Sequence, residues 1–196
     1  MRIIQPIRAG LFLALASAIL LLGWRAFASD ALRPVIAVGD LHGDYDAYFS
    51  ILRAAGLVDA KGKWSGGDAI LVQLGDVPDR GPDTKKIIEH LMKLEKQAKR
   101  KGGRVEALIG NHEAMNVIGD LRYVTPEEYA AFATKKSAKL RATHFKANFV
   151  ALSEFYRTKD PALTDDGVKA AYEKDVPLGY LEHRIAWGPR GKCGAW

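Results

Sequence analysis

Three short polar stretches carry the residue types that hold metal ions, bind anions and move protons. They are Gly39–Gly43 (Gly-Asp-Leu-His-Gly), Gly75–Gly81 (Gly-Asp-Val-Pro-Asp-Arg-Gly) and Gly110–Glu113 (Gly-Asn-His-Glu). Carboxylate and amide oxygens and imidazole nitrogens are ligands for divalent metals, and histidine is the most frequent proton donor in catalysis. An arginine adds a planar, permanently charged group that suits phosphate oxygens. The residue types therefore predict metal-assisted chemistry on a phosphate group.

The spacing of the polar residues indicates which of them can bind each of two metal ions. Asp40 and His42 are two positions apart, so in an extended segment both side chains point the same way and can bind one ion. Asp76 can bridge to a second ion, to which Asn111 adds a neutral oxygen. Two cations about 3.5–4 Å apart can hold both an attacking water and a phosphoryl oxygen.

The other polar residues fit the handling of the substrate and of a proton. Arg80 can clamp phosphate oxygens. His112 stands beside Asn111 in the sequence, so it is the natural proton donor to a leaving oxygen, and Asp79 is the natural group to orient its imidazole. The alternative for His112 is a core histidine with a satisfied hydrogen bond. The alternative for the first stretch is a plain tight turn, which explains its glycines but not its Asp and His.

Taken together and in this order, the three motifs resemble those of the calcineurin-like metallophosphoesterases, and among them the phosphoprotein phosphatase branch. Three such motifs in one chain are rare by chance. Residues 119–124 (Gly-Asp-Leu-Arg-Tyr-Val) and 179–184 (Gly-Tyr-Leu-Glu-His-Arg) resemble the bacterial Shewanella-like protein phosphatases. The resemblance covers residues 34–196 and only the N-terminal part of the family's domain.

This resemblance implies a hydrolase that uses two divalent metal ions, Mn, Fe or Zn. It implies a phosphorylated protein or a small phosphoester as the substrate, and a place for Asn111 beside Arg80 in phosphate binding. It also implies the roles given above for the catalytic residues and the metal ligands, which are His112, Asp79, Asp40, His42, Asp76 and Asn111.

The chain departs from the family pattern after the third motif. Family members bring two further histidine ligands, and usually another phosphate-binding arginine, from the second half of the domain. His144 falls in a helical stretch and His183 in the terminal segment, and neither comes after a strand in a glycine-flanked setting. The second sheet of the family's sandwich is also absent. We therefore expect a truncated domain that binds metal weakly and hydrolyses phosphate esters poorly.

Two other functions remain open. One is a nucleotide or dinucleoside polyphosphate hydrolase with the same metal core, although Glu113 favours the protein phosphatases because related nucleotide hydrolases often have Asp there. The other is a non-catalytic fragment that binds a partner through an exposed sheet. A nucleic-acid partner is not expected, because Glu89 and Glu95 interrupt the lysines of the helix predicted over 83–101 and no aromatic residues are interleaved for base stacking.

Apolar runs precede all three motifs and predict the elements that position them. The runs at 34–38, 69–74 and 105–109 each end at a glycine and are typical of buried strands. Helical periodicity predicts helices over 44–55 and 83–101 between them. The alternation predicts an α/β fold, a layered metallophosphoesterase-type sheet with flanking helices, in which right-handed crossovers bring the three loops to one edge.

Farther along the chain the signals are helical. Thr125-Pro126-Glu127-Glu128 is a capping box that predicts the start of a helix. A second helical stretch is predicted over 135–157, and then a loop over 161–167. The last segment, 177–196, is rich in Gly and Pro and ends on an aromatic residue without a polar tail.

The N-terminus has the layout of a secretory signal peptide. Arg2 and Arg8 precede the apolar run 10–24, and Ala26-Phe27-Ala28 comes next as a small-residue cleavage signal. Arg25, close to the cleavage point, keeps an N-terminal anchor as the alternative. Cleavage removes three arginines and no acid, so the formal charge falls from +6 to +3.

We therefore expect a signal peptide or anchor over 1–28 and a truncated metallophosphoesterase domain over 29–196. The expected location is the periplasm or the exterior, with an inner-membrane anchor holding the domain outside the cytoplasm as the alternative. Contact with a membrane is expected only through an uncleaved leader. A hydrophobic content of 48% with 27% charged residues favours a globular domain over a disordered one, and the single Cys193 excludes an internal disulfide.

Overall fold

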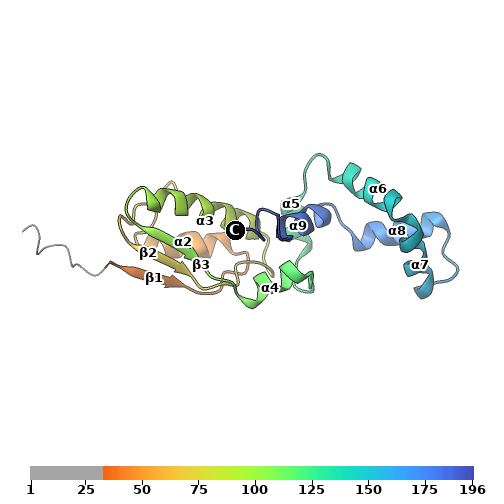
Figure 1. The fold of residues 1–196 in the computed structure, drawn as a ribbon, viewed down its shortest axis with the longest axis horizontal. Helices are drawn as coiled ribbons and strands as arrows, with labels where there is room; N and C mark the ends of the chain where they lie inside the picture. The colour runs from red at the N-terminus through yellow and green to blue at the C-terminus, as the bar shows by residue number, and fades with distance from the viewer. Residues whose placement is uncertain (1–32) are drawn as a thin grey trace, which may run out of the picture. The chain divides into compact units, whose positions relative to one another are not determined.

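A three-stranded parallel sheet organises the first half of the described chain (Figure 1). The computed structural model describes residues 33–196, of which residues 35–196 form one unit. The strands are β1 (Val35–Val38), β2 (Ile70–Gln73) and β3 (Arg104–Ala107), in the order β1-β2-β3. Their register pairs Val38 with Gln73 and Gln73 with Ala107, so all three strands end at the same level. The predicted α/β fold is confirmed, and the three motifs leave the same edge of the sheet.

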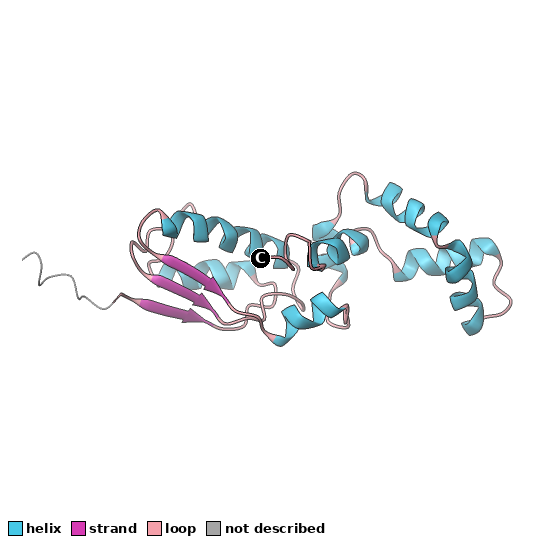
Figure 2. Ribbon diagram, in the orientation of Figure 1, coloured by secondary structure: helices cyan, strands magenta, loops and turns pink. Residues whose placement is uncertain are grey.

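Two helices form the crossovers between the strands and lie on the same side of the sheet (Figure 2). They are α2 (Tyr45–Ala54) and α3 (Thr84–Lys99). Asp44 begins α2 by accepting a hydrogen bond from the amide of Ala47 at 2.9 Å. Leu52 of α2 and Leu91 of α3 are fully buried with strand residue Leu71 in one hydrophobic core. This core fixes the sheet edge from which the motif loops project.

Part of the sheet remains exposed. Val35 is 63% exposed, Leu74 is 49% exposed and Leu108 is 50% exposed. Among residues 33–196 the three strands form the only sheet, so the second sheet of the family's sandwich is not part of the described structure. Val35 begins β1, and Leu74 and Leu108 directly follow β2 and β3, so the exposed apolar side chains at the two ends of the sheet are available for contact.

Three helices beyond β3 pack near the motif loops. They are α4 (Asn111–Ile118), α5 (Pro126–Phe132) and α9 (Tyr180–Trp187). The third motif is therefore the first turn of α4 rather than a loop. The predicted cap of α5 is confirmed, because Thr125 Oγ1 accepts from the amide of Glu128 at 3.2 Å. The sequence analysis assigned no element after residue 177, where α9 forms and contacts both α4 and α5.

The remaining helices form a separate small cluster with its own core. They are α6 (Ser137–Ala147), α7 (Phe149–Lys159) and α8 (Asp165–Asp175), and α6 is the helix of this group that contacts α9. The helix predicted over 135–157 is broken at Asn148, which ends α6 and begins α7. The loop predicted over 161–167 is wrong at its end, because Thr164 caps α8 by accepting from the amide of Gly167 at 3.1 Å.

The leader predicted over 1–28 lies outside the described residues. Within residues 33–196, the search for a helix long and apolar enough to cross a membrane finds none.

Candidate active site

The first two motif loops are bonded to each other through their backbones. The amides of Leu41 and His42 both donate to the carbonyl oxygen of Asp76 at 3.0 Å, and the amide of Gly43 donates to the carbonyl of Val77 at 2.9 Å. Each of these bonds joins groups more than thirty residues apart in the sequence. The predicted metal ligands of the first loop are thereby held beside Asp76 of the second.

Gln73, the last residue of β2, adds a side-chain link between the same loops. Its side chain is almost completely buried, with 1% exposure. Its Nε2 donates to the carbonyls of Gly39 at 3.2 Å and Gly75 at 2.7 Å, and its Oε1 accepts from the amide of Gly75 at 2.8 Å. Sequence reasoning missed this role, because Gln73 falls within an apolar strand.

Glu113 of the third motif joins the third loop to the second. Its carboxylate accepts from the amides of Asp76, Val77 and Gly110, each at 2.8 Å. Hydrogen bonds to an ionised acceptor are about twice as strong as neutral ones. Sequence reasoning used Glu113 only to separate protein phosphatases from nucleotide hydrolases and missed its part in building the site. A carboxylate at the third position of a helix was a usable signal, since such a residue often accepts from amides at the helix start.

Four site residues hold a backbone conformation that side chains rarely adopt. The non-glycine residues with positive φ in the described part of the chain are His42 at 44°, Asp76 at 57°, Asp79 at 72° and Arg80 at 65°. Such positions cost about 1–3 kcal/mol each and cluster at functional sites. All four were predicted site residues, so the strain of this fold is concentrated where the motifs meet.

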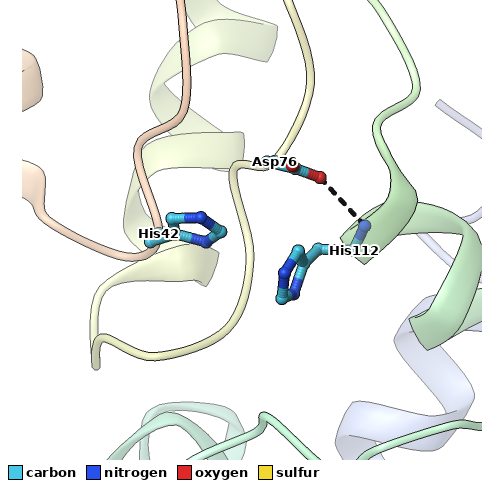
Figure 3. A group of neighbouring side chains, drawn as sticks. All are labelled: His42, Asp76 and His112. Carbon is cyan, nitrogen blue, oxygen red and sulfur yellow. Dashed lines mark hydrogen bonds between the residues drawn. The ribbon is translucent and has the colours of Figure 1, made fainter.

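His42 and Asp76 come from two loops and His112 from the first turn of α4, and the three side chains surround one space (Figure 3). One ligand atom from each lies within 4.8 Å of the others. His42 Nδ1 lies 3.1 Å from the carbonyl oxygen of Pro78, and because a carbonyl only accepts, Nδ1 carries the proton and Nε2 keeps its lone pair. Asp76 Oδ1 accepts from the amide of His112 at 2.9 Å. Nitrogen and oxygen donors of this kind suit a divalent transition metal.

The two other predicted metal ligands lie at the border of this cluster. Asp40 Oδ2 is 3.7 Å from His42 Nε2, and its side chain is 67% exposed. Asn111 is exposed at the first position of α4, directly before His112. The predicted ligand set was Asp40, His42, Asp76 and Asn111. The closest cluster of possible ligand atoms shares His42 and Asp76 with that set, and its third member is His112.

His112 and Asp79 form a buried pair. His112 Nδ1 lies 2.6 Å from Asp79 Oδ2, and the two side chains are 3% and 0% exposed. Because the carboxylate accepts, Nδ1 carries the proton and the other ring nitrogen faces outward. There the guanidinium of Arg80 donates to Nε2 over 3.4 Å. Asp79 therefore fixes both the tautomer and the orientation of the His112 ring.

Asn116 completes the surroundings of this pair. It lies one turn after His112 on α4 and is fully buried. Its Nδ2 donates to Asp79 Oδ1 at 3.0 Å and to the carbonyl of His112 at 2.9 Å. Sequence reasoning missed Asn116, although residues four apart on a helix share a face.

Tyr123 lies against the outward side of the same pair. Its ring centroid is 5.2 Å from that of His112 and 5.8 Å from the guanidinium carbon of Arg80. Its carbonyl accepts from the amide of Arg80 at 3.0 Å. The segment 119–124, which the sequence offered only as a family resemblance, thus forms one wall of the site.

Comparison with known proteins decides the family. The family model described as calcineurin-like phosphoesterase matches residues 33–172, more than half of the chain. The chain belongs to the calcineurin-like phosphoesterase family. The resemblance predicted from the three motifs is thereby confirmed, and divalent metals are the cofactors of this family.

Several relatives match about half of this phosphoesterase chain. An uncharacterised protein of Schizosaccharomyces pombe is 50% identical over 100 residues, which are 50% of the chain and 30% of that protein. The Shewanella-like protein phosphatase 2 of Arabidopsis thaliana is 45% identical over 98 residues, which are 50% of the chain and 25% of that protein. The crystal structure of a cold-active protein-tyrosine phosphatase of a psychrophilic Shewanella species shares 37% identity at a TM-score of 0.49, over 52% of the chain and 30% of that structure. The matches thus cover less than a third of each relative.

The other two histidines considered in this phosphoesterase lie away from the metal donors. His144 Nδ1 bonds the hydroxyl of Tyr172 at 2.9 Å. His183 of α9 is completely buried with its Nε2 3.7 Å from Glu128 of α5. Burial, and to a lesser extent Tyr180 and Glu128, raises the pKa of the neighbouring Tyr129 phenol. His144 thus belongs to the packing of α6 against α8, and His183 to the packing of α9 against α5.

Proposed function

We propose that this phosphoesterase is a metal-dependent phosphatase that hydrolyses phosphate monoesters. The observation that supports the proposal is the convergence of three motif loops on a space that holds metal donors on one side and the His112–Asp79 pair on the other. The chain spans less than a third of the length of these relatives. That the chain itself is active is therefore part of the proposal.

Asp40, His42, Asp76 and Asn111 would hold the metal ions. When bound, the ions supply Lewis acidity and activate water for attack on phosphorus. His42 is prepared for this by its bond to Pro78, which leaves Nε2 as the free donor. Asp76 presents its second carboxylate oxygen, because Oδ1 already accepts from the amide of His112.

Arg80 and His112 would act on the substrate. Arg80 binds phosphate oxygens, and Asn111 contributes a further polar contact. His112 acts in the form protonated on both ring nitrogens: it donates the Nε2 proton to the leaving oxygen and is left as the neutral ring with its proton on Nδ1, which Asp79 holds. Nε2 cannot accept from Arg80 and donate to a leaving group at the same time, so the 3.4 Å contact between them must open when phosphate draws the guanidinium away.

Metal binding and turnover test this proposal together. Mn²⁺ titration by calorimetry and hydrolysis of p-nitrophenyl phosphate would be compared for the wild type, Asp76→Asn and Asp166→Asn. Asparagine tolerates the left-handed backbone of Asp76 better than most residues, so Asp76→Asn removes charge with little strain. Asp166 is exposed on α8, so Asp166→Asn makes the same charge change away from the site.

We expect weak Mn²⁺ binding and slow, EDTA-sensitive turnover in the wild type and in Asp166→Asn. Asp76→Asn should lose both Mn²⁺ binding and turnover, because it removes the carboxylate that we expect to bridge the two metal ions. Turnover that survives EDTA or Asp76→Asn, or Mn²⁺ binding equal in all three proteins, would contradict the proposal.

A phosphorylated protein is the proposed substrate. Support comes from the relative in Arabidopsis, whose name is that of a protein phosphatase, and from Glu113 in the third motif. The competing proposal is a nucleotide or dinucleoside polyphosphate. Parallel assays with a phosphopeptide, ATP and a dinucleoside polyphosphate separate them, and faster release of phosphate from either nucleotide would favour the second.

Partner binding without catalysis is the remaining candidate. Its supporting observation is the exposure of apolar residues at the ends of the strands, where Val35, Leu74 and Leu108 are about half exposed or more. Size-exclusion chromatography with light scattering would reveal self-association through this surface. Dimers or larger species without metal-dependent turnover would favour this candidate over the phosphatase.

Export of the domain also remains a proposal. It depends on the sequence of residues 1–28, and expression in a Gram-negative host tests it. A periplasmic product that begins at Ser29 would support cleavage, whereas a membrane-bound product with an intact N-terminus would support the anchor.

A further inference from the structure

Asn116 makes contacts that a packing residue would not need. It is fully buried on α4, and its Nδ2 reaches both Asp79 Oδ1 at 3.0 Å and the carbonyl oxygen of His112 at 2.9 Å. Both partners, a carboxylate oxygen and a backbone carbonyl oxygen, accept hydrogen bonds. The amide nitrogen must therefore face them, because the reversed amide would bring an oxygen against two other oxygens.

The other end of the Asn116 amide has no partner. Its Oδ1 is buried and accepts no hydrogen bond from the described residues. A buried polar atom without a partner costs stability. Asn116 therefore loses stability at Oδ1 and gains it from the two hydrogen bonds of Nδ2. We infer that the hydrogen-bond donor is what this position requires.

The bond from Asn116 determines how Asp79 can lie. Asp79 is fully buried with a left-handed backbone at φ 72°. Asn116 occupies Oδ1 and the His112 ring occupies Oδ2 at 2.6 Å. With one donor on each oxygen, the carboxylate cannot rotate without breaking a bond. The plane of Asp79, and hence the orientation of the His112 ring, is set from α4.

A contact from α9 supports the same turn of α4. Arg184 Nη1 donates to the carbonyl of Asn116 over 3.4 Å. Gly119 ends the helix with a left-handed φ of 89°. The Arg184 guanidinium lies where a side chain at Gly119 would begin. The position of Asn116 is thus fixed by its helix and by a neighbouring one.

We propose that Asn116 is a positioning residue for proton donation. By its hydrogen bond to Asp79 Oδ1 it fixes the carboxylate that binds His112 Nδ1, and so it keeps the ring oriented with Nε2 towards the leaving group. The inference rests on the proposed phosphatase function for its consequence in catalysis. Its structural content, the alignment of the His112 ring, does not depend on turnover.

The chain offers a matched control. Asn148 also donates from Nδ2 to the carbonyl of a histidine four residues earlier, His144, at 2.8 Å. Asn148 is exposed, and its side chain contacts no carboxylate. Asn148→Ala therefore removes the same kind of local bond as Asn116→Ala but leaves the His112–Asp79 pair untouched.

The first measurement is nuclear magnetic resonance of the metal-free protein with ¹⁵N-labelled histidine. The Nδ1 proton of His112, assigned by its loss in His112→Gln, should be slow to exchange in the wild type and in Asn148→Ala. In Asn116→Ala its exchange should be faster by about tenfold or more, because the carboxylate that protects it can turn away. Should Asn116→Ala fail to fold, Asn116→Ser is measured instead, since its shorter side chain fills part of the space without reaching Asp79.

The second measurement compares two leaving groups. p-Nitrophenolate leaves readily with little protonation, whereas phenolate needs a proton donor. Asn116→Ala should lower turnover of phenyl phosphate by about 10–100-fold and that of p-nitrophenyl phosphate by much less. A variant that is merely less stable would lower both rates equally.

The two measurements keep the two proposals apart. Unchanged exchange of the His112 proton in Asn116→Ala, or equal losses on both substrates, would overturn the role of Asn116. A wild-type chain without turnover would count against the proposed function, and the exchange measurement would then decide the role of Asn116 alone.

Discussion

The carboxylate of Glu113 is expected to stabilise the whole site, and its replacement gives the sharpest test of the structure. It accepts three backbone hydrogen bonds, from Asp76, Val77 and Gly110. Glu113→Gln keeps the size of the side chain but turns one oxygen into an amide nitrogen. That nitrogen cannot accept, so at least one of the three amides loses its partner and faces another donor.

The expected loss depends on the number of bonds. A hydrogen bond to a charged acceptor contributes about 1.5–3 kcal/mol, so losing one and weakening the others should cost about 2–3 kcal/mol. With a urea m-value of about 2 kcal/mol/M, the unfolding midpoint should fall by about 1 M. Mn²⁺ binding should weaken as well, because Asp76 is one of the residues that Glu113 anchors.

Urea unfolding monitored by circular dichroism measures the loss, with Glu154→Gln as the control. Glu154 is exposed on α7, so its substitution should move the midpoint very little. A midpoint for Glu113→Gln that equals that of Glu154→Gln would refute the reasoning, since the three bonds would then contribute nothing to the folded state.

Three further outcomes are expected. Asp79→Asn should lower turnover by about 10²–10⁴-fold in the p-nitrophenyl or phenyl phosphate assay, because an amide no longer fixes the tautomer of His112. Glu128→Leu should raise the free energy of unfolding by about 1–3 kcal/mol in urea unfolding, because both oxygens of this fully buried side chain lack a hydrogen-bond partner among the described residues and an unpartnered buried polar group costs about that much. Burial raises the pKa of the Cys193 thiol from 9.0 to about 11, so below pH 9 both states hold the proton and above it only the unfolded state releases it. The free energy of unfolding should therefore fall between pH 9 and 11, by up to about 3 kcal/mol. In urea unfolding, the free energy of unfolding of Cys193→Ala should fall less across this range.

The motif loops could be predicted because their signals are local. Apolar runs ending in glycine marked β1, β2 and β3, and the right-handed crossover rule placed their loops at one edge. Even the pairing of His112 with Asp79 was anticipated from the types of the two residues, and the structure places them 2.6 Å apart.

Two helices were not predicted correctly because the local sequence at each is compatible with a loop as well as with a helix. Asp165-Asp166-Gly167 has the composition of a turn, yet it forms the first turn of α8 because Thr164 caps it. The segment after 177 has the Gly and Pro content of a loop, yet α9 forms there and buries His183 and Trp187 completely or nearly so. At α8 a local cap outweighed the turn-like composition, and at α9 tertiary packing overrode the local preference.

The sequence by itself determined which residues carry chemistry and the order of the elements that present them, because both depend on residue type and short-range periodicity. Only the tertiary structure decided how those residues are held. Glu113, Gln73 and Asn116 bond groups more than thirty residues away or on another loop, and no spacing along the chain reveals such partners. The left-handed backbone of Asp76 and Asp79 is likewise maintained by these distant bonds, since local preference alone would release it.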